Sequence, residues 1–223
     1  MKTLLTANNI SKTYKKTGDS IQVLKSVNLS ICKGEIVVLM GPSGSGKSTL
    51  MNILGTLDLS YYGEICIDGV EISSHVDLNS IRSSKLGFVF QFHHLLPEFT
   101  IIENLEIPGL INNGNGMNKK DIMELLFHIG LEERINHYPD EISGGEKQRV
   151  AVIRSLVGNP LLILADEPRG NLDRENSQLL LNLISDLRDK YRQSFLIATH
   201  DDLITQIADR ILYLKDGVIK EGI

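Results

Sequence analysis

A glycine-rich loop between an apolar segment and a helical pattern constrains the fold of this 223-residue chain more than any other feature. The loop, GPSGSGKS, runs from Gly41 to Ser48; the apolar residues 36–40 precede it and a predicted helix over 48–57 follows. Its spacing, G-x-x-x-x-G-K-S, is typical of loops whose backbone N–H groups surround phosphate groups. The structural alternative is a serine- and glycine-rich turn that only caps a helix. The pattern predicts a strand, an anion-binding loop and a helix in succession.

The charge balance of the chain means that such a loop must supply its own positive charge. The sequence has 23 lysines and arginines against 28 acidic residues, a formal net charge of −5. A helix N-terminus contributes roughly half a positive charge, Lys47 contributes a full one, and the hydroxyl of Ser48 suits Mg²⁺. We expect the residues that bind a nucleoside triphosphate here to be Gly41, Pro42, Ser43, Gly44, Ser45, Gly46, Lys47, Ser48 and Thr49.

Composition argues against several other functions. No long basic run interrupts the acidic balance, so nucleic acid is disfavoured as the main ligand. The longest apolar runs are five residues, against about 20 needed to cross a bilayer. The amino terminus reaches the polar Asn8 before a signal-peptide core can form, and no lysine-rich surface helix is present. We therefore expect a cytosolic chain that meets a membrane only through a protein partner.

The remaining pattern predicts one α/β domain over residues 1–223 with a mostly parallel sheet. Two β-rich segments flank a turn at Lys16 to Asp19 and suggest an antiparallel pair, and a hairpin follows around Asp68 and Gly69. A mostly helical insertion over about 92–158 has a polar break at 112–118. Strands alternating with helices imply a sheet covered on both faces. The expected helix after the insertion covers 175–191, and a terminal hairpin is expected around 215–217. The expected β segments are 4–14, 21–31, 35–40, 63–72, 86–91, 161–166 and 194–199.

Two carboxylates and a histidine follow predicted strands. The apolar residues 161–165 end in Asp166 and Glu167, and His200 follows strand 194–199. Ligand sites of parallel sheets lie beyond the carboxyl ends of the strands. Asp166 is suited to Mg²⁺, Glu167 to orienting or deprotonating a water, and His200 to reaching the terminal phosphate. Read alone, the acids are also consistent with a cap or a solvated strand end, and the histidine with a surface residue.

A further segment, ISGGE, precedes a helical pattern. Ser143 and Glu146 form a capping box, which is by itself a complete structural explanation. Gly144 and Gly145 are harder to explain, because each glycine weakens a helix by about 1 kcal/mol. Both are expected where an anion must approach the backbone closely.

These motifs resemble those of the ABC-transporter ATPases, in the same order and over nearly the whole chain. They are the phosphate loop, Gln91 after a strand, ISGGE, LLILADEP, Gly170 to Asp173, and His200. The resemblance implies an ABC ATPase fold that uses ATP and Mg²⁺. It implies an ATP-dependent head-to-tail dimer in which Ser143 and Gly145 of one copy meet the terminal phosphate held by the loop of the other, with Gly144 and Glu146 also binding the nucleotide. It also implies that Tyr14 stacks on adenine and that Gln91 links Mg²⁺ to a permease interface.

The finer resemblance is to the ATPases of lipoprotein-releasing transporters, through residues 55–58 (GTLD) and 91–100 (QFHHLLPEFT). It implies a subunit on the cytoplasmic face of the inner membrane that contacts permease subunits near Gln91 to Thr100. The apolar side chains in that stretch, Phe92, Leu95, Leu96 and Phe99, are alternatively ordinary core residues.

Other assignments remain open at this level. They are the ATPase of a macrolide-export or cell-division permease, a soluble ABC ATPase of translation or DNA repair, and a nucleotide-binding module without turnover. The soluble class generally carries two cassettes or a long coiled coil, which this chain lacks. Two residues depart from the family pattern: Arg169 replaces a threonine, beside the loop expected to face the dimer, and Ile142 replaces a leucine.

Overall fold

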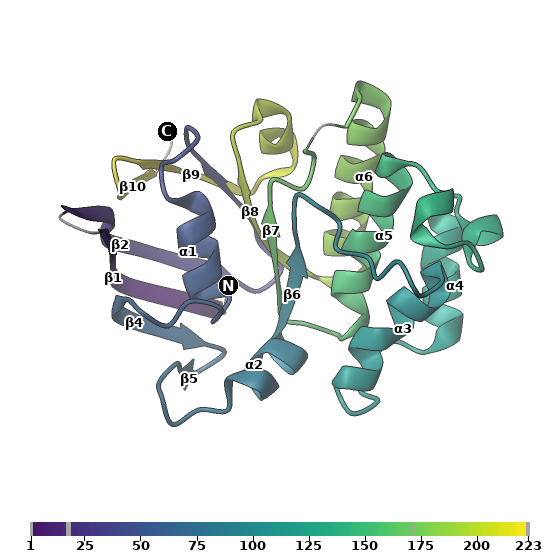
Figure 1. Cartoon of the computed structure of the whole chain (residues 1–223), viewed down its shortest axis with the longest axis horizontal. Helices are drawn as coiled ribbons and strands as arrows, with labels where there is room; N and C mark the ends of the chain where they lie inside the picture. Colours follow the sequence, from purple (N-terminus) through teal and green to yellow (C-terminus); the bar gives the residue numbers. More distant parts are fainter. Residues whose placement is uncertain (1, 17–18, 171, 222–223) are drawn as a thin grey trace.

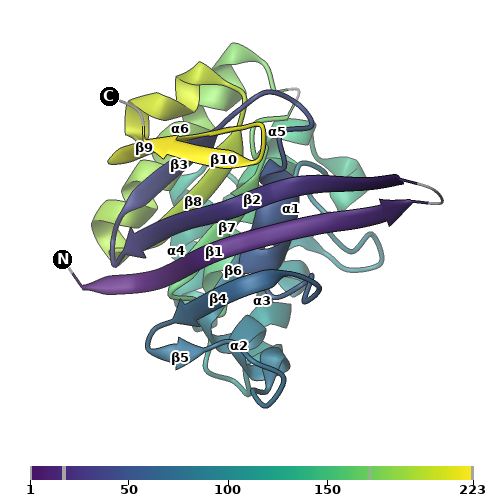
Figure 2. The same ribbon diagram turned by 90° about the vertical axis from the view of Figure 1, so that its left-hand side faces the viewer.

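The computed structural model describes residues 2–16, 19–170 and 172–221. An antiparallel sheet in the order β2-β1-β4-β5 forms one side of the molecule (Figure 2). Its strands confirm the predicted antiparallel pair and hairpin, whereas Thr17 and Gly18 of the predicted turn lie outside the described residues. The strands are β1 (Thr3–Lys16), β2 (Asp19–Cys32), β4 (Tyr62–Ile67) and β5 (Val70–Glu71).

A second sheet has the order β10-β9-β3-β8-β7-β6. Neighbouring strands from β9 to β6 are parallel and β10 is antiparallel, as the mostly parallel prediction requires. The carboxyl ends of β3, β8 and β7 therefore lie side by side at one edge, which brings together the segments that follow them. The strands are β3 (Ile36–Met40), β6 (Leu86–Val89), β7 (Leu162–Asp166), β8 (Ser194–Thr199), β9 (Arg210–Lys215) and β10 (Val218–Glu221).

Helices cover both faces of the parallel sheet (Figure 1). Helix α1 lies between the two sheets, while α3, α4, α5 and α6 lie on the other side. Alternate residues of β3 face the two sides: Ile36 and Val38 pack with the helical block, and Val37 and Leu39 pack with α1 and the antiparallel sheet. The helices are α1 (Lys47–Leu54), α2 (Leu78–Lys85), α3 (Ile101–Ile111), α4 (Lys119–His128), α5 (Gly144–Val157) and α6 (Arg174–Tyr191).

Short 3-10 helices complete the structure at Glu132–Arg134, Pro139–Glu141 and Asp202–Ile207. In the described ranges, no helix combines the length and apolar character that spanning a membrane requires.

Besides small differences at strand ends such as those of β1 and β2, the structure differs from the predicted elements at α1, β6 and α2. Helix α1 ends at Leu54 instead of residue 57, because Gly55 closes it and Thr56 adopts a left-handed backbone with φ of 58°. Strand β6 ends at Val89, two residues short of the prediction. Helix α2 was not predicted; its local signal is Asp77, whose carboxylate accepts the backbone N–H groups of residues 79 and 80 as an N-cap.

Candidate active site

The glycine-rich loop leaves β3 and ends at the N-terminus of α1, as the sequence predicts. Gly46 has a φ of 104°, and a side chain there would meet Val23 and Leu24 of β2. No side chain in the described part of the chain caps the start of α1. Pro42, Ser43 and Gly44 are exposed. The loop is therefore an open cradle of backbone donors, as phosphate binding requires.

Lys47 lies in this loop with its charge held close to the backbone. Its side chain is only 7% exposed, and Nζ donates to the carbonyl oxygens of Gly41 at 2.7 Å and Pro42 at 3.3 Å. Nζ also lies 3.7 Å from Oε1 of Glu167. The predicted cation and the predicted carboxylate therefore meet in the fold, although 120 residues separate them, from 47 to 167.

Asp166, the last residue of β7, provides an acceptor that lacks a partner. Its Oδ1 is buried and has no hydrogen-bond partner in the described part of the chain. Burial raises the pKa of the Asp166 carboxyl and the charge of Glu167 adds to this rise, while a hydrogen bond from Ser48 and the charge of Lys47 oppose it. A carboxylate beside a hydroxyl is a donor set that Mg²⁺ prefers, and a bound cation would satisfy Oδ1. These residues fit Mg²⁺ better than the alternative of a solvated strand end.

Glu167 is held from two sides at the same edge of the sheet. His200 donates from Nδ1 to Oε1 at 2.8 Å, and Thr199 donates from Oγ1 to Oε2 at 3.0 Å. The backbone of Glu167 is left-handed, with φ of 46°, and its N–H donates to Ala198 at 2.8 Å. His200 is two-thirds exposed, with 66% of its side-chain area accessible. The carboxylate is thus fixed in orientation, and the imidazole reaches from it toward solvent.

Gln91 lies next to this edge, whereas Tyr14 lies on the antiparallel sheet. Gln91 is exposed just beyond β6, and a Cβ on Gly170 would lie 3.7 Å from its Cγ, so Gln91 borders the loop that follows Glu167. Tyr14 is 45% exposed near the end of β1. Asn171, part of the predicted motif after Arg169, lies outside the described residues.

The start of α5 confirms the predicted capping box and shows how tightly one of its glycines packs. Ser143 accepts the backbone N–H of Glu146 at 3.3 Å, and Glu146 accepts that of Ser143 at 2.7 Å. A Cβ on Gly145 would overlap the Asn176 side chain, so close packing within the chain is a second reason for glycine at this position. Gly144 is exposed with open space around it.

The residues from Ser143 to Glu146 are not joined to the rest of the site within one chain. No hydrogen bond or ion pair among the described residues connects them to the phosphate loop or to Glu167. The side chain of Arg169, one of the two departures from the family pattern, is only 13% exposed and forms an ion pair with Asp201 next to His200. Sequence reasoning missed this partner.

The segment after Gln91 divides into exposed and packed side chains. Phe92, Leu96 and Phe99 are 73%, 40% and 41% exposed, whereas Leu95 packs against the helical core. The core interpretation therefore holds for Leu95 alone.

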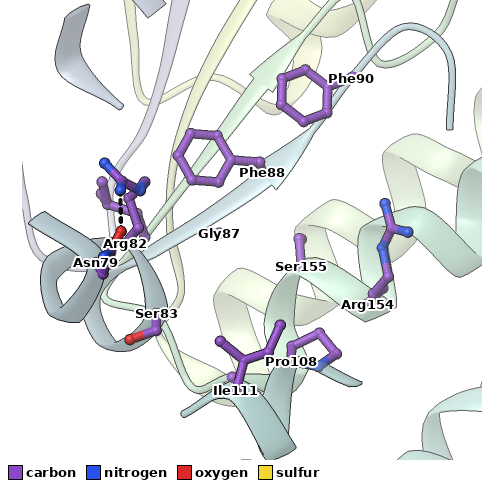
Figure 3. A pocket seen from close by; sticks show the side chains of 12 residues that line it. Asn79, Arg82, Ser83, Gly87, Phe88, Phe90, Pro108, Ile111, Arg154 and Ser155 are labelled. Carbon is purple, nitrogen blue, oxygen red and sulfur yellow. Dashed lines mark hydrogen bonds between the residues drawn. The ribbon is translucent and has the colours of Figure 1, made fainter. Parts of the chain in front are cut away.

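A groove beside this segment is shown in Figure 3. It has a volume of about 460 Å³ and lies between the α2–β6 segment and helices α3 and α5. Phe88 and Phe90 stack in it with their ring centroids 5.9 Å apart, opposite Ile111. Arg154 of α5, at its rim, donates to the carbonyl oxygen of His93 at 2.9 Å. The groove combines an apolar wall with a nearby positive charge.

Comparison with known proteins gives consistent matches over nearly the whole chain. The ABC transporter family model matches residues 24–170, more than half of the chain. The lipoprotein-releasing system ATP-binding protein LolD of Bacteroides thetaiotaomicron is 49% identical over 212 residues, covering 92% of this chain and 96% of that protein. LolD of Cytophaga hutchinsonii is 45% identical, covering 98% and 100%. The dimeric, post-hydrolysis structure of the ATP-binding cassette MJ0796 with ADP and Pi has a TM-score of 0.88 at 40% identity, covering 98% of both chains.

These matches, together with the fold and the phosphate loop, place the chain in the ABC transporter family, in the class of ATP-binding subunits that are ATPases. Within that family, the relatives that it resembles include LolD subunits of lipoprotein-releasing systems. The predicted family, fold class and finer resemblance are thereby confirmed.

Proposed function

We propose that this chain binds and hydrolyses MgATP as the energy-supplying subunit of a transporter that releases lipoproteins from the inner membrane, at whose cytoplasmic face it lies. The observation that carries the enzymatic part is Glu167, held by His200 and Thr199 where the phosphate loop and Asp166 meet. The sequence identity to LolD relatives, 42–49% over most of the chain, supports the assignment to a lipoprotein-releasing system. The alternative is the ATPase of a macrolide-export or cell-division permease.

Each side chain of the site has a distinct part in this proposal. The loop from Gly41 to Thr49 and the charge of Lys47 bind the phosphates of ATP. Ser48, Asp166 and Gln91 would hold Mg²⁺, which supplies positive charge to the phosphate oxygens. Glu167 accepts a proton from the attacking water. The hydrogen bonds from His200 and Thr199 fix the orientation of its carboxylate for this role. His200, exposed beyond Glu167, reaches the terminal phosphate, and Tyr14 stacks on adenine.

A second copy of the chain completes the site in this proposal. Ser143 and Gly144 are exposed at the start of α5, so their donors are open to a nucleotide held by a partner copy. The dimeric state of the MJ0796 structure supports a homodimer. We propose that ATP binding closes a head-to-tail dimer and that hydrolysis reopens it, which is a shift between two populated states.

The permease contact is proposed to lie near Gln91 to Thr100, where the helical insertion begins. The chain acts as one domain over residues 1–223, in which the segment 92–158 is inserted into the nucleotide-binding core. The exposed side chains of Phe92, Leu96 and Phe99 and the groove of Figure 3 together offer an apolar surface next to Gln91. Exposed apolar patches of this kind mark protein contacts. Closure of the dimer would reach the permease through this surface.

Affinity purification from gently solubilised membranes tests this assignment. We expect a tagged chain to co-purify, in an ATP-sensitive way, an integral membrane permease with a large periplasmic domain that retains lipoprotein. The matched variants are Ile111→Asp and Leu110→Asp, neighbours in α3 that are 64% and 73% exposed, of which only Ile111 lines the groove. Ile111→Asp should lower recovery at least ~10-fold, as a charge buried in an apolar contact does, and Leu110→Asp should not.

The identity of the recovered partner decides between the alternatives. A drug-export or cell-division permease would contradict lipoprotein release while leaving the ATPase assignment intact. Equal recovery with both variants would show that the groove is not the contact surface. Both variants must retain the ATPase rate of the isolated subunit.

The ion pair between Arg169 and Asp201 leads to a separate prediction about turnover. Asp201 is adjacent to His200 and also accepts the backbone N–H of Leu203 at 2.9 Å, so the pair ties the loop after β7 to the loop that carries His200. Arg169→Thr, which restores the family residue, should lower kcat about 10-fold, because a small misplacement of a positioned group is costly. The Kd for ATP should stay unchanged. Arg169→Lys, which keeps the charge, is the control; a wild-type kcat in Arg169→Thr contradicts the prediction.

A further inference from the structure

A buried lysine next to Tyr14 has no part in the function proposed above. The side chain of Lys12, on β1, is only 5% exposed, which is rare for a lysine unless its charge is paired. Its Nζ lies 2.6 Å from Oδ2 of Asp58 and donates to the carbonyl oxygen of Ser60 at 2.6 Å. The same Nζ lies 4.8 Å from the ring centroid of Tyr14. The ammonium therefore connects an aromatic ring on β1 to the segment that follows α1.

Asp58 completes the cluster from that segment. The pKa of the Asp58 carboxyl is lowered overall. Burial raises this pKa, but the hydrogen bonds from Lys12 and from the backbone N–H of Ser60, together with the charge of Lys12, lower it by more. The hydroxyl of Tyr14 lies 3.5 Å from Oδ2 of Asp58. Tyr14 is thus contacted by the cation over its ring and by the carboxylate at its hydroxyl, and 45% of its surface stays accessible.

The cluster lies close to the phosphate loop. Lys12 is opposite Leu24 in the β1–β2 pair. Leu24 and its neighbour Val23 are the side chains that a Cβ on Gly46 would meet. Strand β1 therefore holds the ring of Tyr14 at a fixed place relative to the loop, and Lys12 with Asp58 fixes the ring on that strand.

We propose that Lys12 is a positioning residue for the nucleobase: paired with Asp58, it holds the ring of Tyr14 ready to stack and so sets the affinity for the base and not for the phosphates. The inference rests on the proposed role of Tyr14. A ring that is already held loses less conformational freedom on binding than a free side chain, which raises affinity. A cation over one part of an aromatic ring is itself a favourable contact.

The test compares MgADP with Mg-pyrophosphate, which share the diphosphate but differ in the base, on the full-length chain by calorimetry. We expect Lys12→Met and Asp58→Asn each to weaken ADP binding about 10-fold, an order of magnitude typical of a lost aromatic contact. Pyrophosphate binding should change less than about twofold. The two substitutions change the charge in opposite directions, so an effect of charge on the phosphates would move the two pyrophosphate affinities apart.

Two further variants set the scale. Lys15→Met removes the same charge from an exposed position on β1 and should leave both affinities unchanged. Tyr14→Ala should weaken ADP binding at least as much as Lys12→Met, and adding Lys12→Met to Tyr14→Ala should cause no further loss, because the lysine acts through the ring. Thermal unfolding of each variant identifies any that fails to fold; if Lys12→Met does, Asp58→Asn carries the comparison.

The possible failures are distinct. If Tyr14→Ala weakens ADP binding but Lys12→Met and Asp58→Asn do not, the inference is wrong and the proposed function stands. If ADP and pyrophosphate weaken equally, the cluster supports the phosphate loop and the inference is again wrong. If Tyr14→Ala leaves ADP binding unchanged, the proposed stacking of Tyr14 on adenine is wrong, and the inference fails with it.

Discussion

Glu167→Gln is expected to lower kcat for ATP hydrolysis about 10²- to 10⁴-fold, the range for loss of a general base, while ATP still binds. The amide of glutamine keeps the size of the side chain and an oxygen that accepts the bond from Thr199, but it cannot take a proton from water. The substitution also removes a negative charge 3.7 Å from Nζ of Lys47. ATP affinity should therefore be equal or higher, and ATP-dependent dimers should accumulate.

Phosphate release, equilibrium ATP binding and light scattering measure these three effects. Asp202→Asn is the matched control, because Asp202 is an exposed acid in the segment after His200. It removes one negative charge near the site without touching Glu167 and should retain the wild-type rate. Retained hydrolysis in Glu167→Gln would reject Glu167 as the group that activates water.

Lys47→Ala is expected to produce the largest loss of ATP affinity. A unit charge 4 Å from a phosphate oxygen is worth about 4 kcal/mol at an intermediate dielectric, an upper-range figure, which corresponds to about 10³-fold in Kd. We expect a loss between about 10²- and 10³-fold, because part of this energy replaces the hydrogen bonds that Nζ already donates to the carbonyl oxygens of Gly41 and Pro42. The carbonyl oxygens of Gly41 and Pro42 also lose their donor, which loosens the loop.

Displacement of a fluorescent nucleotide measures this affinity. Lys220→Ala is the control, because it removes the same charge from an exposed position on β10, which is distant from the loop in the sequence. It should leave the Kd for ATP unchanged. Undiminished ATP affinity in Lys47→Ala would contradict the assignment of the phosphate loop. Since Lys47→Ala acts on binding and Glu167→Gln on the chemical step, the two variants separate the proposed closing of the dimer from its reopening.

Local patterns in the sequence determined the main elements of the fold and the residues at its active edge. The loop before α1, the capping box of Ser143 and the apolar strand before Asp166 depend on neighbours within a few residues, so spacing is sufficient to find them. The meeting of Lys47, Glu167 and His200 followed from one rule of topology, that parallel strands end at the same edge.

Contacts between distant segments, in contrast, follow from the packing of the fold. Lys12 meets Asp58 across 46 residues, and Arg169 meets Asp201 from the loop after another strand. Gly145 packs so closely on Asn176 that a Cβ would overlap its side chain. None of these pairs has a periodic or local signal, because which side chains meet depends on how strands and helices pack. Spacing in the sequence is therefore enough to predict which groups do the chemistry, while packing sets which groups lie against them.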